Sequence, residues 1–242
     1  MDDFSSRLAE IHSQIAAAAQ KAGRDASEIE LIAVSKTHPT EAVQEALRAG
    51  VTLFGENKVQ EARVKIEELG RGIWHLIGHL QSNKVKDAVR LFDSIDSVDR
   101  LDLATEINLR ADAHGKTQNV LLQVNVAGES TKFGCPPESA RKLAEEINAL
   151  PRLTLRGLML IAPFSPEVER SRPHFAALRE LRDQIQTDTG LDLPVLSMGM
   201  SGDFAVAIEE GATCVRVGTA LFGERLTLKQ RRPEDPSFIE ST

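Results

Sequence analysis

The 242-residue chain contains no tyrosine and a single tryptophan. Tyrosine often serves as a catalytic base or a phosphate ligand, so other residues must supply both functions in this protein. Only two cysteines occur, Cys135 and Cys214, too few for a disulfide framework and too far apart for a zinc knuckle. We therefore expect two inert thiols in a reducing cytoplasm and no metal site.

The chain also lacks long apolar runs and clustered basic residues. No apolar segment approaches the roughly 20 residues that span a membrane, and the acidic, amphipathic segment 1–14 is unlike a signal peptide. The formal net charge is -7 and the basic residues are scattered, unlike the basic surface of a nucleic-acid-binding protein. We therefore expect a cytoplasmic protein that binds neither membranes nor nucleic acids.

Strand-like apolar runs alternate with amphipathic helical segments along nearly the whole chain. We expect eight strands, at residues 31–36, 51–54, 73–78, 92–98, 119–126, 155–160, 194–198 and 213–217. A helical pattern follows each strand, which predicts an α/β fold with a single (β/α)8 TIM barrel. An open doubly wound sheet usually has fewer strands and a glycine-rich first turn, whereas segment 35–39 contains no glycine.

An additional helix is expected before the barrel. The apolar residues of segment 3–23 recur at helical spacing: Phe4, Leu8, Ile11, Ile15 and Ala19. Further along, the acidic residues Glu56 and Asp99 are suited to helix starts. We expect one barrel domain over residues 1–226 and a polar, proline-broken tail over residues 227–242.

Lys36 is the first candidate functional residue, because chemistry in parallel barrels takes place at the C-terminal ends of the strands. It ends the first apolar run and is followed by Thr37, His38 and Pro39. An amine desolvated at the end of a buried strand loses basicity and becomes a nucleophile toward carbonyl groups. A strand-end lysine whose ammonium group reaches into water is the alternative interpretation.

Hydroxyl groups and glycines follow strands seven and eight. Ser201 and Gly202 lie in segment 197–203, and Gly218 and Thr219 follow the last strand. Either pair alone is typical of a glycine turn with a helix cap. Because loops after the last two barrel strands often bind phosphate through backbone amides, the two pairs together favour a phosphate site.

Arg216 is the lone basic residue of the apolar eighth strand. Strand alternation places it on one face with Cys214 and Gly218. Because strands one and eight are neighbours in a closed barrel, Arg216 and Lys36 meet across the barrel mouth if both point inward; otherwise a buried arginine is usually a paired structural residue. An amine, a phosphate site and an arginine together suit an aldehyde-bearing phosphorylated cofactor, pyridoxal 5′-phosphate (PLP).

Five segments resemble, in order, motifs of the pyridoxal phosphate homeostasis protein family: AVSKTHP, FGENKVQEA, WHLIGHLQSNK, MGMSGDF and VRVGTALFGER. The resemblance implies a stand-alone barrel similar to the N-terminal domain of alanine racemase. It implies a protein of vitamin B6 homeostasis that carries PLP as a Schiff base and has no established catalytic turnover. By position, it implies a Schiff-base lysine at Lys36, a phosphate site at Ser201, Gly202, Gly218 and Thr219, an arginine facing the pyridine nitrogen at Arg216, and residues near the ring at Asn57 and His79.

The arginine bears on whether bound PLP would be catalytic. An arginine does not readily give up a proton, so the pyridine nitrogen stays neutral and the ring withdraws electrons weakly. Racemisation also needs a base on each face of the substrate, and Lys36 supplies only one. We therefore expect a carrier that buffers PLP or delivers it to PLP-dependent apoenzymes. We expect a monomer, because the second domain that builds the racemase dimer is absent.

Two alternatives remain open. One is a low-activity PLP-dependent amino-acid racemase or transaminase-like enzyme, with His79 or a residue of loop 127–136 as the second base. The other is a phosphosugar aldolase-type barrel in which Lys36 forms the Schiff base. A metal site at His75 and His79 is not expected, because four residues of strand separate them by about 13 Å.

Overall fold

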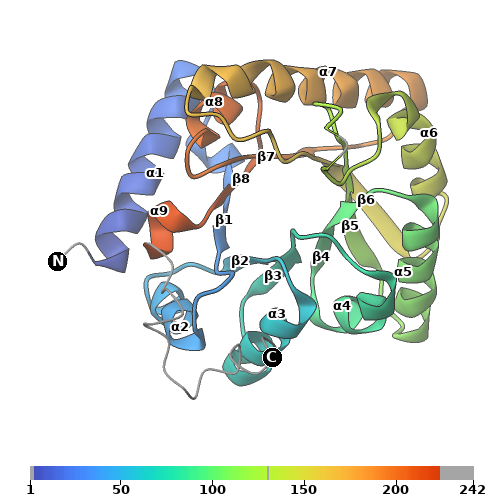
Figure 1. The fold of residues 1–242 in the computed structure, drawn as a ribbon, viewed down its shortest axis with the longest axis horizontal. Coiled ribbons are helices and arrows are strands. Elements are labelled where there is room, and N and C mark those ends of the chain that lie inside the picture. The colour runs from blue at the N-terminus through green and yellow to red at the C-terminus, as the bar shows by residue number, and fades with distance from the viewer. Residues whose placement is uncertain (1–2, 130, 224–242) are drawn as a thin grey trace.

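Eight parallel strands form a closed barrel in which neighbours along the chain pair and β1 pairs with β8 (Figure 1). The structure is a computed structural model that describes residues 3–129 and 131–223. The strands are β1 Glu30–Val34, β2 Leu53–Glu56, β3 Ile73–Leu76, β4 Ser94–Val98, β5 Gln118–Gln123, β6 Leu153–Met159, β7 Val195–Met200 and β8 Cys214–Val217. The expected TIM barrel is confirmed, and each strand lies within a few residues of its predicted range.

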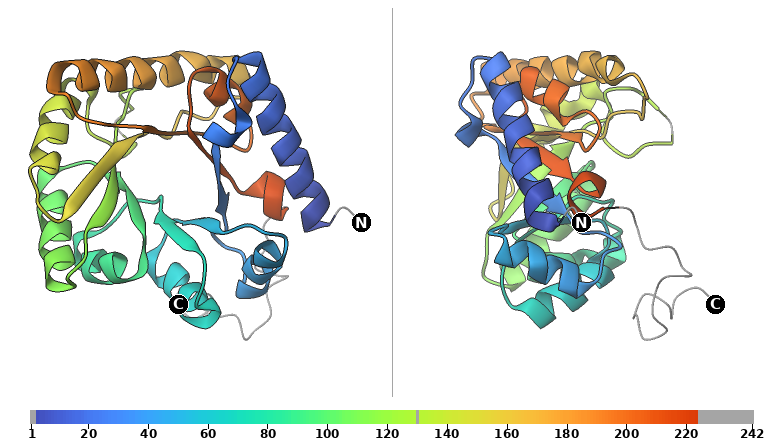
Figure 2. Two further views of the ribbon diagram at one scale, coloured as in Figure 1. Left: turned by 180° about the vertical axis from the view of Figure 1, so that it is seen from behind. Right: turned by 90° about the vertical axis from the view of Figure 1, so that its left-hand side faces the viewer.

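Helices surround the strands as an outer layer, as Figure 2 shows from behind and from the side. They are α1 Phe4–Lys21, α2 Thr40–Arg48, α3 Val59–Leu69, α4 Val85–Leu91, α5 Leu101–Ala113, α6 Pro137–Asn148, α7 Arg172–Thr189, α8 Phe204–Glu209 and α9 Thr219–Phe222, with short 3-10 turns η1 Ala26–Glu28, η2 Ser82–Lys84 and η3 Val168–Ser171. Most buried apolar side chains belong to one large cluster of strand and helix residues. Each large side chain in it stabilises the fold by about 1.5–3 kcal/mol relative to exposure.

A smaller apolar group fills the inside of the barrel, and its buried members are Ile32, Val34, Ile77 and Cys214. Ile32 lies opposite Arg216 in the parallel β1–β8 pairing, so the two side chains share the inner face, as strand alternation predicts. Gly55 of β2 leaves room for this group, because a Cβ there would lie 2.6 Å from Cγ2 of Ile32. The inner face therefore carries a small apolar cluster together with Arg216.

The additional N-terminal helix α1 packs on the outside of the barrel against α8 and α9 (Figure 1). All five residues expected on its apolar face are buried. Arg7 Nε donates a hydrogen bond to Leu221 O of α9 at 2.7 Å, and Lys21 Nζ lies 2.7 Å from Glu209 Oε1 of α8. Apolar burial and these polar contacts join the first helix to the last two.

The end of β1 differs from the prediction. The strand ends at Val34 rather than at Lys36. Ser35 N still donates to Gly55 O of β2 at 3.1 Å, but Thr37 has a φ of 66°, a left-handed conformation that turns the chain away from the sheet. Lys36 therefore lies in the turn between β1 and α2, where it is half-buried.

Both cysteines are buried and neither is part of a disulfide. Burial raises the pKa of the Cys135 thiol to about 12 and that of the Cys214 thiol to about 12. Both thiols are therefore expected to stay protonated near neutral pH, and their inertness stays a prediction.

The expected tail, residues 227–242, lies outside the described residues, as do residues 224–226 of the expected barrel domain. Within residues 3–129 and 131–223, none of the helices has both the length and the apolar character needed to cross a membrane.

Candidate functional site

Arg216 of β8 is a buried cation on the inner face of the barrel, with an exposed fraction of 4%. Its Nη1 donates to Ser197 Oγ at 2.7 Å and its Nη2 donates to Leu160 O at 2.7 Å. In the described part of the chain no carboxylate forms an ion pair with it, and burial lowers the pKa of Arg216. A buried guanidinium without a carboxylate is suited to donate a hydrogen bond to an acceptor on a ligand.

The loops after β7 and β8 are joined by a hydrogen bond from Gly218 N to Ser201 Oγ at 3.2 Å. Gly218 also packs on β1, because a Cβ there would lie 3.2 Å from Val34 O. A Cβ at Gly202 would meet no atom within 4 Å, so this part of the backbone borders open space. Thr219 is exposed and begins α9. The four residues expected to bind phosphate thus lie on two joined loops beside the end of β1.

The loop after β7 is held in shape by Asp203 and by a glycine. Asp203 Oδ1 accepts a hydrogen bond from Met200 N at 2.7 Å. Gly199 has a φ of 92°, and a Cβ there would lie 2.6 Å from Cβ of Ala207 in α8. Only glycine fits both the backbone conformation and this close approach. The loop is therefore fixed on both sides of its turn.

Lys36 reaches the same end of the barrel from the β1 side. It follows Val34, on which Gly218 packs, by two residues. The ring of His38, two residues further on, stacks on Phe222 of α9 with ring centroids 5.1 Å apart. The end of β1 is therefore in contact with the β8 loop, and the turn that carries Lys36 is in contact with the helix that follows that loop.

Asn57 and His79 follow β2 and β3 at this same end. Gly78 packs directly on the Asn57 backbone, because a Cβ there would lie 2.4 Å from Asn57 O. The His79 ring stacks on Phe133 with ring centroids 3.7 Å apart and an interplanar angle of 11°. Within the described residues, the buried Nδ1 of His79 has no hydrogen-bond partner. A buried ring nitrogen in this state is open to a hydrogen bond from a ligand or water.

The stacked Phe133 belongs to loop 127–136, and 54% of this residue is exposed. The next residue, Gly134, donates its N–H to Asp99 Oδ2 at 3.3 Å. Asp99 was expected to cap α5, but the capping position is Arg100, so the Asp99 carboxylate holds the loop instead. The sequence does not show the contact of this loop with His79, because that contact depends on the loop conformation.

A buried ionic pair beneath the Lys36 turn was also not expected. Glu56 was expected at a helix start, but it is the last residue of β2 and fully buried. Its Oε1 lies 2.6 Å from Lys65 Nζ of α3, and burial raises the pKa of Glu56 in spite of this cation. Helical spacing could have shown that Lys65 is buried, because it continues the buried face of Val59 and Ala62, but it gives no sign of the partner Glu56.

A second polar pair, the partly exposed His75 and the buried Asp96, joins β3 and β4. His75 Nδ1 lies 2.9 Å from Asp96 Oδ2, and Ser94 Oγ donates to Asp96 Oδ1 at 2.5 Å. Burial by itself lowers the pKa of His75, but the carboxylates of Asp96, Glu30 and Asp93 together outweigh it and the pKa is raised. Across residues 3–129 and 131–223, the structure shows no group of three or more His, Cys, Asp or Glu side chains arranged to hold a metal ion.

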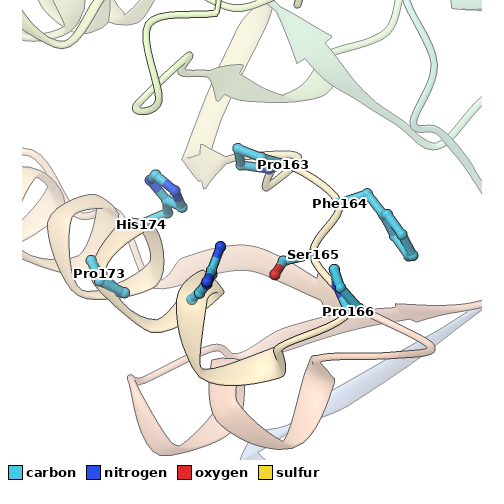
Figure 3. Close-up of a pocket in the computed structure, with 7 residues that line it drawn as sticks. Pro163, Phe164, Ser165, Pro166, Pro173 and His174 are labelled. Carbon is cyan, nitrogen blue, oxygen red and sulfur yellow. The ribbon is translucent and has the colours of Figure 1, made fainter.

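A pocket lies on the loop after β6 and the start of α7 (Figure 3). Its lining includes Pro163, Phe164, Pro166 and His174, and 92% of Phe164 is exposed. None of the eight predicted site residues, all of which the structure describes, lines it. The pocket is therefore distinct from the eight predicted site residues.

Comparison with known proteins identifies the family. Residues 7–226 match the family model "Alanine racemase, N-terminal domain". A pyridoxal phosphate homeostasis protein from Aquifex aeolicus (strain VF5) is 47% identical over 222 residues, which cover 90% of this chain and 97% of that protein. The chain belongs to the pyridoxal phosphate homeostasis protein family. The resemblance that its five motifs indicate is thereby confirmed.

Solved structures agree with membership of the pyridoxal phosphate homeostasis protein family. PipY of Synechococcus elongatus PCC7942, solved with PLP bound, superposes with a TM-score of 0.82 at 40% identity, covering 91% of this chain and all of PipY (100%). Alanine racemase of Clostridium difficile 630 superposes with a TM-score of 0.75 at 16% identity, covering 96% of this chain and 59% of the racemase. At 16% identity the second likeness shows the fold alone.

Proposed function

We propose that this chain binds PLP at the mouth of the barrel and holds it as a Schiff base on Lys36, as a PLP carrier in vitamin B6 homeostasis. The observation that carries the proposal is the pair of loops joined by Ser201 and Gly218, packed on β1 two residues before Lys36. This arrangement supports a phosphate site close in the fold to Lys36. PipY, a structural neighbour at 40% identity, has PLP bound.

Each predicted residue has a part in this proposal. Ser201, Gly202, Gly218 and Thr219 bind the phosphate through backbone amides and hydroxyl groups. Arg216 donates a hydrogen bond to the pyridine nitrogen, and the two groups that it already contacts, Ser197 Oγ and Leu160 O, hold its guanidinium in place. Asn57 and His79 line the ring, where the buried Nδ1 of His79 lacks a partner among the described residues.

The proposed role is binding and release without turnover. When bound, PLP supplies an aldehyde for the amine and a ring that withdraws electrons. Arg216 is a donor with no proton to give up readily, so the pyridine nitrogen stays neutral and the ring withdraws electrons weakly. No tyrosine is present in the chain to act as a second base. Both features favour a carrier over a racemase.

Borohydride reduction followed by peptide mass analysis tests the attachment point. Reduction fixes the bond between cofactor and amine, and we expect a pyridoxyl group on the peptide that contains Lys36. Lys36→Met removes that adduct, whereas Lys142→Met keeps it, because the Lys142 side chain is 81% exposed on α6. A wild-type adduct on a different lysine contradicts the assignment. A protein that retains no chromophore from PLP supports the aldolase-type alternative.

Exchange of the α-hydrogen of alanine in deuterium oxide separates a carrier from a racemase. A carrier leaves the α-hydrogen in place even when fully loaded with PLP. Exchange that depends on Lys36 and occurs at enzymic rates would establish the racemase alternative, with His79 as the first residue to substitute.

The location, the oligomeric state and the recipients of PLP are also part of the proposal. We propose that the protein is a cytoplasmic monomer that delivers PLP to PLP-dependent apoenzymes. Sedimentation analysis with and without PLP tests the monomer. Transfer is tested by mixing the loaded protein with a PLP-dependent apoenzyme and measuring the gain of enzyme activity against free PLP at the same concentration.

A further inference from the structure

Lys65 is a buried lysine whose ammonium group is fully hydrogen-bonded. Its exposed fraction is 3%, and its Nζ lies 2.8 Å from Ser35 O, 2.6 Å from Glu56 Oε1 and 3.2 Å from Glu61 Oε1. An ammonium has three hydrogens to donate, so these acceptors occupy all of them. Lys65 is therefore held as a donor and does not act as a nucleophile. We refer to Ser35, Glu56, Glu61 and Lys65 as the Lys65 cluster.

The Lys65 cluster holds both chain neighbours of Lys36. On the N-terminal side, the Ser35 hydroxyl donates to Glu56 Oε1 at 2.6 Å while the Ser35 carbonyl accepts from Lys65. On the C-terminal side, the Thr37 N–H donates to Glu61 Oε1, the oxygen that also accepts from Lys65. A single buried ammonium thus connects to the residue before Lys36 and, through Glu61, to the residue after it.

Thr37 needs such support because its backbone is strained. Its φ of 66° lies in the left-handed region, which a β-branched residue rarely adopts. Strain of this kind persists only where the surrounding structure imposes it, and it occurs often at functional sites. The bond from Thr37 N to Glu61 and the bond from Thr37 Oγ1 to Lys36 O at 2.5 Å are the contacts that impose it here.

Stability alone does not explain the buried charges. Replacing a buried ion pair by apolar residues of similar size is often neutral or stabilising, because desolvation offsets the attraction between the charges. Glu56 is moreover incompletely satisfied, since within the described residues its buried Oε2 has no hydrogen-bond partner. A buried charged group that bonds to both chain neighbours of Lys36, directly or through Glu61, is suited to positioning the Lys36 turn.

We propose that Lys65, acting through Glu56, Glu61 and Ser35, is a positioning residue that fixes the Lys36 backbone so that its amine meets the aldehyde of PLP in a productive orientation. This role rests on the proposed function. It adds that residues which do not touch the cofactor control formation of the bond to Lys36. Phosphate binding belongs to the loops after β7 and β8 and is independent of the cluster.

The step that the cluster accelerates is a condensation. The neutral Nζ of Lys36 attacks the aldehyde carbon and a C–N bond forms. The carbonyl oxygen then leaves as water, taking both hydrogens of the amine, and a C=N bond remains. Nothing is oxidised or reduced. The rate of this step depends on orientation of the amine, and small displacements from a reactive geometry slow such steps strongly.

The test is a double variant, Glu56→Gln with Lys65→Met, which removes both charges of the buried pair together. Glu61, which is partly exposed, loses its contact with Lys65 and keeps its contact with Thr37. The matched control is Lys142→Met with Glu146→Gln, which removes an exposed helix pair four residues apart. Two quantities are measured: the rate at which PLP becomes trapped on Lys36 by borohydride, and the Kd for pyridoxine 5′-phosphate. The second ligand has the ring and phosphate but no aldehyde, so it reports on binding without bond formation.

We expect the trapping rate of the double variant to fall about tenfold or more while its Kd for pyridoxine 5′-phosphate is unchanged. The surface control changes neither quantity. An unchanged trapping rate in the folded double variant overturns the proposal. A trapping rate and an affinity that fall together also overturn it, because the cluster would then support the whole barrel mouth.

A second variant, Glu61→Ala, keeps the experiment decisive if the double variant does not fold. Glu61 is partly exposed, with 24% of its side chain accessible, and its loss leaves the Glu56–Lys65 pair in place. We expect a smaller fall in the trapping rate, because only the support of Thr37 is lost; no fall overturns the proposal. Failure of the proposed function itself is read from the wild-type protein alone, as the absence of any adduct on Lys36.

Discussion

On the β1–β3 side of the barrel mouth, buried charged side chains hold the Lys36 turn in place, whereas on the β7–β8 side backbone N–H groups bonded to Ser201 and Asp203 hold glycine-containing turns. Lys36 lies above a buried ion pair between Glu56 and Lys65. Ser201 and Gly218 instead lie on short glycine-containing turns joined by one hydrogen bond. The difference follows from the proposed roles of the two sides, covalent attachment at Lys36 and phosphate binding at the loops after β7 and β8. A covalent anchor must be oriented, and buried charges orient it, while a phosphate needs backbone amides that no side chain obstructs.

The largest effect that distinguishes the two sides is expected from Gly78→Ala. A Cβ at this position would lie 2.4 Å from Asn57 O, a backbone atom that has no freedom to move aside. We expect a loss of about 3 kcal/mol in the free energy of unfolding, measured by urea denaturation. The matched substitution on the other side, Gly202→Ala, meets no atom within 4 Å and leaves the free energy of unfolding unchanged. Equal losses in both variants contradict the distinction.

Arg216→Met is expected to have the next largest effect, on binding of PLP. The variant removes the charged donor that we propose for the pyridine nitrogen, which weakens PLP binding by about 2 kcal/mol, or roughly 30-fold. The Kd for PLP in protein with Lys36→Met measures this effect without the covalent bond. Ser197→Ala is the control, because it removes one acceptor of Arg216 and leaves the guanidinium in place. Equal effects of the two substitutions would argue against a direct contact.

Gly202→Ala also tests the β7–β8 side through its effect on PLP affinity. The position borders open space, so the added methyl group has no protein neighbour to displace and can only obstruct a ligand. We expect PLP affinity to fall about tenfold, or about 1.4 kcal/mol, at unchanged stability. Calorimetric titration with pyridoxine 5′-phosphate measures this loss. Unaltered affinity shows that the phosphate does not approach Gly202.

The smallest expected effect concerns the pair His75 and Asp96, and it depends on pH. The folded-state pKa of His75 is raised above its unfolded value by Asp96. The stability that it contributes is therefore fully present below the unfolded pKa of about 6.5, and it is lost as the pH rises through the folded pKa. At the acidic end of the pH range, we expect the free energy of unfolding of the wild type to exceed that of His75→Gln by about 1 kcal/mol. Urea denaturation from about pH 5 to about pH 9 measures the difference; a difference that grows with pH contradicts the assignment.

Much of the fold and part of the candidate site follow from local patterns. The alternation of strand and helix segments predicts the barrel, because the spacing of apolar residues within each segment depends only on residues close in the sequence. The positions of Ser201 and Gly218 follow from the rule that barrel chemistry occupies strand ends. The inward direction of Arg216 follows from alternation along β8. In contrast, a lysine on the buried face of α3 is visible in the sequence, but the carboxylate that it meets is not.

The sequence by itself determined the barrel, the strand ends that carry the candidate site residues and the family, because periodicity and motifs are encoded over short stretches. Only the tertiary structure decided that Lys65 contacts Glu56, that His79 stacks on Phe133, and that Lys36 lies in a turn beyond β1. These facts depend on distances between segments remote in the chain and on the φ of Thr37. Such distances are set when the barrel closes and its interior packs, so no short stretch of sequence encodes them.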